Sequence, residues 1–188
     1  WKRRLWISVE RFSASHSDHI LCQNPEDVAT ALQERIARTG QISLLGNGID
    51  LRRFRPGLLS SSERTAYRQR LGIPEDALVA GICGRFVAEK GYPEFLAACK
   101  QLESKHPKLH VLLVGHKLVS ERSSDAWDPH AALAPSRVTV LQDRDDMPEL
   151  YACMDIHVLP SHREGFPRVL MEGAAAGLPQ VATAIRGC

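Results

Sequence analysis

Short apolar runs alternate with helix-like segments along almost the whole chain, and this alternation constrains the fold more than any other feature. The run at residues 111–114 is continuous, which is typical of a strand that is buried on both faces. The segment before it carries apolar residues at helical spacing: Phe95, Leu96, Cys99 and Leu102. Such alternation predicts right-handed βαβ units, and therefore an α/β fold with a doubly wound parallel sheet.

The expected elements follow one another in a regular order. We expect strands at residues 19–23, 42–45, 78–83, 109–114, 138–141, 156–159 and 180–183. Helices are expected at residues 25–38, 62–70, 93–105, 147–154 and 167–177. Residues 46–57 are rich in turn formers and suit a linker, whereas residues 120–134 suit a polar loop with one short helix. Ligands of doubly wound sheets bind beyond the carboxyl ends of the strands, so residues that follow strands are the first site candidates.

Composition narrows the classes of function. The chain is 44% hydrophobic and 24% charged, as in ordinary globular domains, and no apolar run approaches the ~20 residues that span a bilayer. A formal charge of +2 gives no reason to expect a nucleic-acid partner. The five cysteines are scattered, so we expect no zinc site or disulfide framework and a cytoplasmic protein: Cys22, Cys83, Cys99, Cys153 and Cys188.

The first residues form a small basic and aromatic cluster. Lys2, Arg3 and Arg4 lie between Trp1 and Trp6, so the segment suits either a peripheral contact with a membrane surface or a solvated helix face. We favour the helix face. The chain starts without methionine, and we expect it to be a piece of a longer protein.

Two of the expected strands end in glycine-containing loops. Gly84 is followed by Arg85 and Lys90, two cations five residues apart that could clamp a diphosphate. The alternative is a solvated basic surface. Gly115 ends the next strand, where a residue without a side chain allows close approach of a ligand to the backbone. A simple turn glycine is the alternative there.

Two glutamates flank the start of the last expected helix. Glu164 precedes it and Glu172 lies inside it, the only charged residue among positions 169–178. A carboxylate on so apolar a helix needs a hydrogen-bond partner, and Pro167 is suited to the first helical position. An ion pair between Arg168 and Glu172 is the alternative role for the second glutamate.

An acidic cluster at residues 143–146 admits two interpretations. Asp143 and Asp145 have the spacing of a divalent-metal site, but Asp145 or Asp146 also directly precedes a helix. We favour the second interpretation, a helix cap whose carboxylate accepts backbone N–H groups. Of the nearby histidines, His157 lies within a strand pattern and reads as structural, and His162 is equally balanced between a structural and a functional role.

Taken together, these motifs resemble the carboxyl-terminal, nucleotide-sugar-binding half of a retaining glycosyltransferase of family 4, within the group 1 enzymes of the GT-B fold. The resemblance implies a Rossmann-like donor domain, incomplete at its end, at residues 51–188. Residues 1–50 would be the end of the amino-terminal, acceptor-side domain and the start of the linker. The matching patches occur in the family's order: Asn47–Asp50 with Phe54, Gly84-Arg85 with Glu89-Lys90-Gly91, Val114-Gly115, and Glu164-Gly165-Phe166-Pro167 with Glu172. His116 departs from the small residue that is common after Val-Gly.

The resemblance also implies roles for single residues. Arg85 and Lys90 would bind the diphosphate and, with Glu164 at the donor sugar, form the catalytic set. Glu172 would accept hydrogen bonds from the ribose. The remaining donor-binding positions would be Gly84, Gly115, Gly165, Phe166 and Pro167. Residues 137–142 would pack along the nucleobase, and no metal or other cofactor is expected.

The resulting functional hypothesis is transfer of a hexose or N-acetylhexosamine from a nucleoside-diphosphate sugar, often a UDP-sugar, to a glycan or lipid-linked acceptor. Synthesis of surface polysaccharide at the inner face of the membrane is the expected setting. Because most of the acceptor half is missing, we expect this chain alone to be inactive. Two alternatives are a nucleotide-sugar-binding domain without transfer activity and another GT-B enzyme, such as a nucleotide-sugar epimerase.

Overall fold

The computed structural model describes residues 1–116 and 133–188, so most of the loop expected at residues 120–134 lies outside the described residues. The chain divides into two compact units. Unit 1 comprises Trp1–Gly48, Glu164–Phe166 and Gly187, and unit 2 comprises Ile49–Arg163, Pro167–Arg186 and Cys188. The assignment of residues 1–50 and 51–188 to an acceptor-side and a donor-side domain stays a prediction.

Unit 1 contains two helices and a small parallel sheet. Strands β1 (Ile20–Cys22) and β2 (Ile42–Leu44) pair with each other, and helix α2 (Pro25–Gln33) follows β1. Asn24 caps α2 because its side chain accepts the Asp27 N–H at 2.7 Å.

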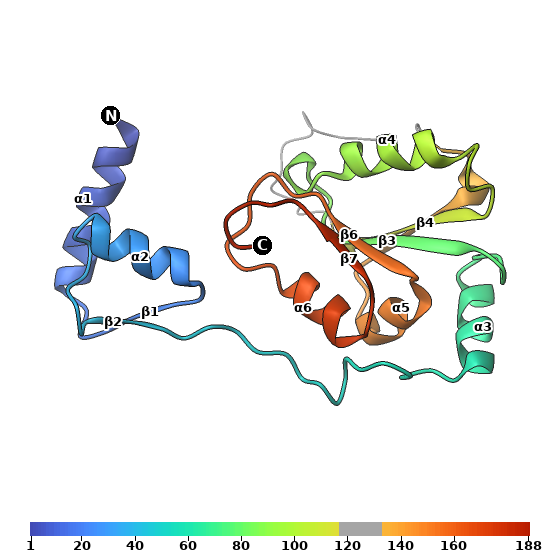
Figure 1. Ribbon diagram of the computed structural model, residues 1–188, viewed down its shortest axis with the longest axis horizontal. Helices are drawn as coiled ribbons and strands as arrows, with labels where there is room; N and C mark the ends of the chain where they lie inside the picture. Colours follow the sequence, from blue (N-terminus) through green and yellow to red (C-terminus); the bar gives the residue numbers. More distant parts are fainter. Residues whose placement is uncertain (117–132) are drawn as a thin grey trace. The chain divides into compact units, whose positions relative to one another are not determined.

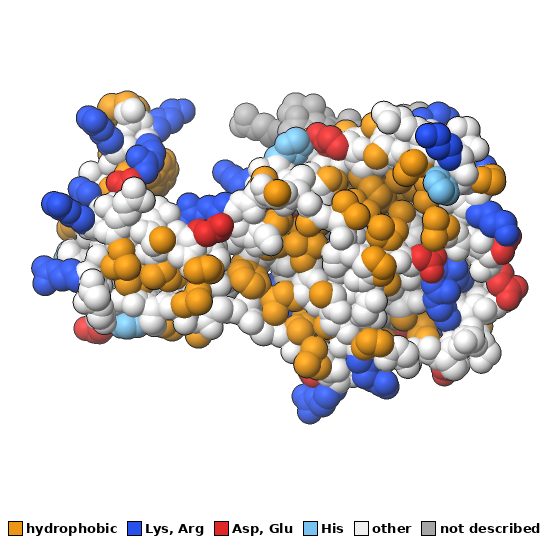
Figure 2. All heavy atoms as spheres, in the orientation of Figure 1, with side chains coloured by type: hydrophobic (Ala, Val, Ile, Leu, Met, Phe, Trp, Pro, Cys, Tyr) orange, Lys and Arg blue, Asp and Glu red, His pale blue; other side chains and the backbone are white. Residues whose placement is uncertain are grey.

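Helix α1 (Lys2–Ser15) precedes these elements. Its first turn carries the basic cluster that was expected on a solvated helix face, but no helix of this length was among the expected ranges. Its cationic side chains gather around it in Figure 2, and Arg3 and Arg11 both bond to Glu34 of the same unit. Trp1 and Trp6 are 92% and 64% exposed. Among the described residues, no helix is both long and apolar enough to cross a membrane. A peripheral membrane contact stays a prediction.

Unit 2 is built on a sheet of five parallel strands within the described residues, in the order β5-β4-β3-β6-β7. The strands are β3 (Leu78–Arg85), β4 (Leu109–His116), β5 (Val138–Gln142), β6 (Ile156–Leu159) and β7 (Gln180–Ala182). The helices are α3 (Ser61–Arg70), α4 (Tyr92–Leu102), α5 (Met147–Cys153) and α6 (Arg168–Ala175), with short 3-10 turns η1 (Ala88–Lys90) and η3 (Pro135–Arg137).

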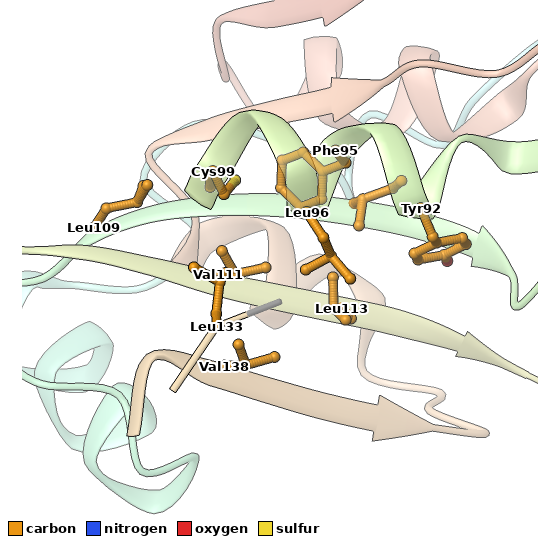
Figure 3. Close-up of a cluster of buried hydrophobic side chains, with 11 residues drawn as sticks. Tyr92, Phe95, Leu96, Cys99, Leu109, Val111, Leu113, Leu133 and Val138 are labelled. Carbon is orange, nitrogen blue, oxygen red and sulfur yellow. The ribbon is translucent and has the colours of Figure 1, made fainter. Parts of the chain in front are cut away.

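Helices cover both faces of this sheet. Helix α4 lies on one face, whereas α5 and α6 lie on the other (Figure 1). Alternate strand residues supply the two cores because successive side chains of a strand point to opposite faces. Val111 and Leu113 pack under α4 (Figure 3), and Ile82 belongs to the same cluster. Val79 and Leu112 pack with α5 in the other cluster. Burial on both faces accounts for the continuous apolar runs of β3 and β4.

The predicted fold class, an α/β fold with a parallel sheet, is confirmed, and each of the seven expected strands is present. The expected helix at residues 167–177 is shorter at both ends. Pro167 is the residue before α6, not its first helical residue, because its ψ of 98° is extended. The strand order changes direction between β3 and β6, and ligands of such sheets bind outside the carboxyl ends at that switch.

A buried ion pair holds the opposite, amino end of the sheet. Arg68 of α3 is 2% exposed and donates to Asp155 Oδ2 at 2.9 Å and to the carbonyl oxygens of Cys153 and Ala77. Asp155 also accepts the Val79 N–H at 2.7 Å. Burial opposes ionisation of Asp155, but the Val79 N–H and the two arginines Arg68 and Arg64 outweigh it and lower its pKa. This pair joins α3, β3 and β6.

Candidate functional site

A pocket of about 570 Å³ opens at the carboxyl ends of the central strands of unit 2. Its walls come from the ends of β3 and β4, the loop after β5, and the helices α5 and α6. The described lining residues are Cys83, Gly84, Val114, Gly115, His116, Asp143, Arg144, Asp145, Met147, Val169 and Glu172. Sites for small ligands and cofactors commonly have volumes of ~300–1,000 Å³, and the volume of this pocket lies in that range.

Two facing glycines form one wall. Gly84 and Gly115 are register partners in β3 and β4, and a Cβ atom at Gly115 would lie 2.0 Å from the Gly84 carbonyl oxygen. Gly84 itself has a φ of 153°, which side chains rarely allow. Only glycine fits at Gly115 without moving the neighbouring strand. Gly115 lies inside β4 and is not a turn residue; the close approach of a ligand there stays a prediction.

Glu172 enters the pocket from α6. Its Oε2 accepts the Tyr151 hydroxyl at 3.0 Å, which supplies the partner that a carboxylate on an apolar helix requires. Of the ion pairs in the described part of the chain, none joins Arg168 to Glu172. The alternative role as an intrahelical ion pair is therefore wrong.

Cys83 and Tyr151 lie behind this glutamate. Both are almost fully buried, and burial raises the pKa of the Cys83 thiol to about 12. Burial, followed by the nearby Cys83 and Glu172, also raises the pKa of the Tyr151 phenol. Both groups are therefore protonated at neutral pH, and Cys83 is not a nucleophile because the thiolate is the reactive form.

The acidic cluster after β5 lies at the pocket and does not cap α5 through a side chain. Asp143 has a left-handed φ of 50° and donates its N–H to the Gly115 carbonyl at 3.0 Å. Asp146 occupies the position before α5, but its carboxylate makes no cap hydrogen bond. It binds the Arg144 Nε at 2.7 Å and the Tyr67 hydroxyl instead. Asp146 thus occupies the expected N-cap position, but its carboxylate bonds to the Arg144 guanidinium and not to the backbone N–H groups of α5.

Arg85 and Lys90 lie beside the pocket without being among its described lining residues. Arg85 is the last residue of β3, and Lys90 ends η1. The Cγ and Cδ atoms of Lys90 lie 3.8 Å from where a Cβ of Gly84 would stand, so the lysine stem packs near the glycine wall. Both cations are half-buried, and both have partners in the structure.

The loop after β6 is tied to the segment that carries Lys90. Arg163 Nε lies 2.9 Å from Glu89 Oε1, and the His162 ring lies 2.7 Å from Glu94 Oε1. The backbone N–H of His162 also donates to the backbone carbonyl oxygen of Glu89 at 2.9 Å. These contacts assign His162 a role in fixing two loops at the switch between β3 and β6.

The structure thus brings together three predicted residues: Gly84, Gly115 and Glu172. Glu164, Gly165 and Phe166 belong to unit 1, and Pro167 is buried before α6. The roles assigned to these four stay predictions. None of residues 137–142, which were expected along the nucleobase, is among the described lining residues of the pocket. In this part of the chain the lining residues are Asp143, Arg144 and Asp145.

Three further observations complete the site. His157 is fully buried and its Nδ1 lies 2.7 Å from Gln180 Oε1, so it is structural as expected. No three His, Cys, Asp or Glu side chains of the described ranges converge as a metal site; metal-independence stays a prediction. Cys83, Tyr151 and Arg144 were not predicted as site residues. Cys83 and Arg144 lie near the ends of β3 and β5, which was the available signal, whereas Tyr151 lies within α5 and gave none.

Comparison with known proteins identifies the family. The profile of the family described as "Glycosyl transferases group 1" matches residues 63–188. The chain belongs to this family. The match covers every strand of unit 2 and all described residues of the pocket.

Individual relatives agree with this membership. The protein named EpsF of Bacillus subtilis (strain 168) is 32% identical over 182 residues, which are 95% of this chain and 46% of the relative. The UDP-Gal:alpha-D-GlcNAc-diphosphoundecaprenol alpha-1,3-galactosyltransferase of Escherichia coli is 26% identical, over 97% of this chain and 46% of the relative. The chain thus spans about half the length of these curated relatives.

A solved structure shows the same likeness in three dimensions. HepE from Anabaena in complex with UDP matches with a TM-score of 0.77 and 25% identity, over 90% of this chain and 46% of HepE. The group 1 family membership and the parallel sheet of unit 2 are therefore established, and the narrower family 4 assignment stays a prediction.

Proposed function

We propose that this chain carries the donor-binding part of a retaining, family 4 glycosyltransferase that transfers a hexose or N-acetylhexosamine from a nucleoside-diphosphate sugar. The observation that carries the proposal is the pocket where Gly84, Gly115 and Glu172 meet at the carboxyl ends of β3 and β4. The proposed acceptor is a glycan or lipid-linked glycan of a surface polysaccharide. UDP is the first nucleotide to test, because HepE was solved in complex with UDP and the E. coli relative is named for UDP-Gal.

The pocket offers complementary groups to the parts of such a donor. Glu172 is the proposed acceptor for the ribose hydroxyls, because a carboxylate has several acceptor positions and Tyr151 occupies only one side of it. The glycine wall would let the diphosphate approach the backbone between β3 and β4. The side chains after β5 would then lie along the base.

Arg85 and Lys90 are the proposed electrostatic catalysts. Negative charge develops on the diphosphate as the sugar leaves, and preorganised cations beside it lower the barrier. Lys90 packs near Gly84, and its segment is fixed by the contact between Glu89 and Arg163. Glu164 stays the proposed partner of the sugar hydroxyls, and no metal is required in this scheme.

Isothermal calorimetry with UDP, GDP, ADP and the corresponding sugars tests the proposal on this chain. We expect one nucleoside diphosphate to bind, and Arg85→Ala and Lys90→Ala to weaken it, since each removes a charge-assisted contact of roughly 1.5–3 kcal/mol. The matched controls are Arg70→Ala and Lys105→Ala, exposed cations outside the pocket. Unchanged affinity in both test variants would contradict the assigned roles, and no binding by the wild type would contradict the function.

Because the chain spans about half the length of its curated relatives, transfer is tested on a protein in which it is joined to an acceptor-side domain. With acceptor present, that protein should release nucleoside diphosphate, and Glu164→Ala should abolish that release. A protein that binds the donor without release would be the non-enzymatic alternative, and an isomerised sugar product without acceptor would indicate the epimerase.

A further inference from the structure

The partner of Glu172 is a fully buried tyrosine on a different helix. Tyr151 of α5 is 0% exposed, and its ring makes edge contacts with Phe54 and His157 at centroid distances of 6.0 and 5.4 Å. These contacts hold the ring in a dense core. The hydroxyl therefore has little freedom, and it meets Glu172 Oε2 at 3.0 Å.

The direction of this hydrogen bond follows from the number of protons. The phenol has one proton to donate, and its oxygen lies 3.0 Å from Glu172 Oε2 and 3.2 Å from the Val169 carbonyl. An ionised carboxylate is the stronger acceptor. Tyr151 is therefore the donor and the Glu172 carboxylate its acceptor.

We propose that Tyr151 is the positioning residue that fixes the Glu172 carboxylate for recognition of the donor ribose. The inference rests on the proposed function. Tyr151 is not a lining residue of the pocket, whereas Cys83 and Glu172 are. Its hydroxyl anchors one carboxylate oxygen from below and leaves the other for the ligand, so the pocket selects ribose over sugars that lack the 2′ and 3′ hydroxyls.

Calorimetry with UDP and 2′,3′-dideoxy-UDP, or the matching pair for the base that binds best, tests the proposal. We expect the wild type to favour the ribonucleotide by about tenfold or more, since a site built to bond hydroxyls rejects analogues that lack them. Tyr151→Phe should lose most of this preference, because it should lower the affinity for the ribonucleotide and leave the affinity for the dideoxy analogue unchanged. Glu172→Gln should lose it too, and adding Tyr151→Phe to that variant should have no further effect, because coupled residues are not additive.

Tyr92→Phe is the matched control. Tyr92 is also fully buried, and its hydroxyl donates to the Gly84 carbonyl at 2.9 Å. Tyr92→Phe removes this bond from the glycine wall of Gly84 and Gly115. It should lower the affinity for both nucleotides equally and leave the preference for the ribonucleotide intact. Equal weakening of both nucleotides by Tyr151→Phe would show a merely structural role and overturn the inference. No binding of any nucleoside diphosphate by the wild type would instead overturn the proposed function.

A second measurement keeps the test decisive if Tyr151→Phe does not fold. With 3-fluorotyrosine in place of the three tyrosines, the Tyr151 ¹⁹F resonance should shift on adding UDP and much less on adding 2′,3′-dideoxy-UDP. A resonance that responds equally to the two nucleotides would overturn the inference.

Discussion

The two ends of the sheet in unit 2 use charged groups in opposite ways. At the amino end, the buried Arg68 and the half-buried Asp155 bond to each other and to backbone groups, and Asp155 also pairs with Arg64. At the carboxyl end, Glu172 has one internal partner and otherwise faces a pocket. The first arrangement has satisfied its charges and can only stabilise the fold. The second retains hydrogen-bonding capacity for a ligand.

The largest expected effect is at the amino end. Arg68→Ala should lower the free energy of unfolding by about 3–5 kcal/mol, because it removes the buried one of the two arginines that pair with Asp155 and leaves the Cys153 and Ala77 carbonyl oxygens without their donor. Denaturant titration measures this change. Lys108→Ala is the control: it removes an exposed pair with Asp76, with side chains 66% and 67% exposed, and should cost at most about 1 kcal/mol.

Measuring nucleotide binding by Arg68→Ala tests whether the two ends of the sheet have separate roles. Folded Arg68→Ala should retain wild-type affinity for the nucleoside diphosphate, since Arg68 does not line the pocket. If stability were unchanged while affinity fell, the functional contrast between the two ends would be wrong.

A somewhat smaller effect is expected from acid. His110, near the amino end of β4, is 3% exposed and bonds Thr139 Oγ1 at 2.9 Å. Burial, aided by the nearby Arg68, lowers its pKa to about 4. Between the usual histidine pKa of ~6.5 and that value the unfolded chain binds a proton that the folded chain refuses, so stability falls as pH falls, by up to about 3 kcal/mol.

His110→Gln should flatten this loss, since glutamine keeps a side-chain N–H donor and does not titrate. Thermal or denaturant unfolding between pH 7 and 4 measures the slope, and the exposed His106→Gln is the control that should preserve it. An unchanged slope in His110→Gln would place the acid-sensitive group elsewhere.

The strands of this fold were predictable because burial on both faces leaves a continuous apolar run, as at 111–114. The extent of helix α1 was not predicted beyond its basic first turn, because its large apolar residues are exposed and its pattern does not mark a buried face. Arg68 was missed because an arginine in a polar helix normally faces solvent. Its burial depends on α3, β3 and the end of α5 meeting in space.

The site was predictable where a residue type was itself unusual. Gly84, Gly115 and the lone Glu172 stood out for that reason, and the structure brings them together. Tyr151 did not stand out because its partner Glu172 is distant in sequence. Arg144 did not stand out because the sequence indicates that the Asp146 carboxylate caps α5, whereas in the structure that carboxylate bonds to Arg144.

The most direct test of the central claim is amide NMR of this chain during titration with UDP, or with the nucleoside diphosphate that calorimetry identifies. We expect the signals of Gly84, Gly115 and Arg144 at the carboxyl end to shift with a common binding curve. Those of Val79 and Asp155 at the amino end should stay in place. Shifts concentrated at Val79 and Asp155, or no shifts at a saturating nucleotide concentration, would contradict a donor pocket at the carboxyl end.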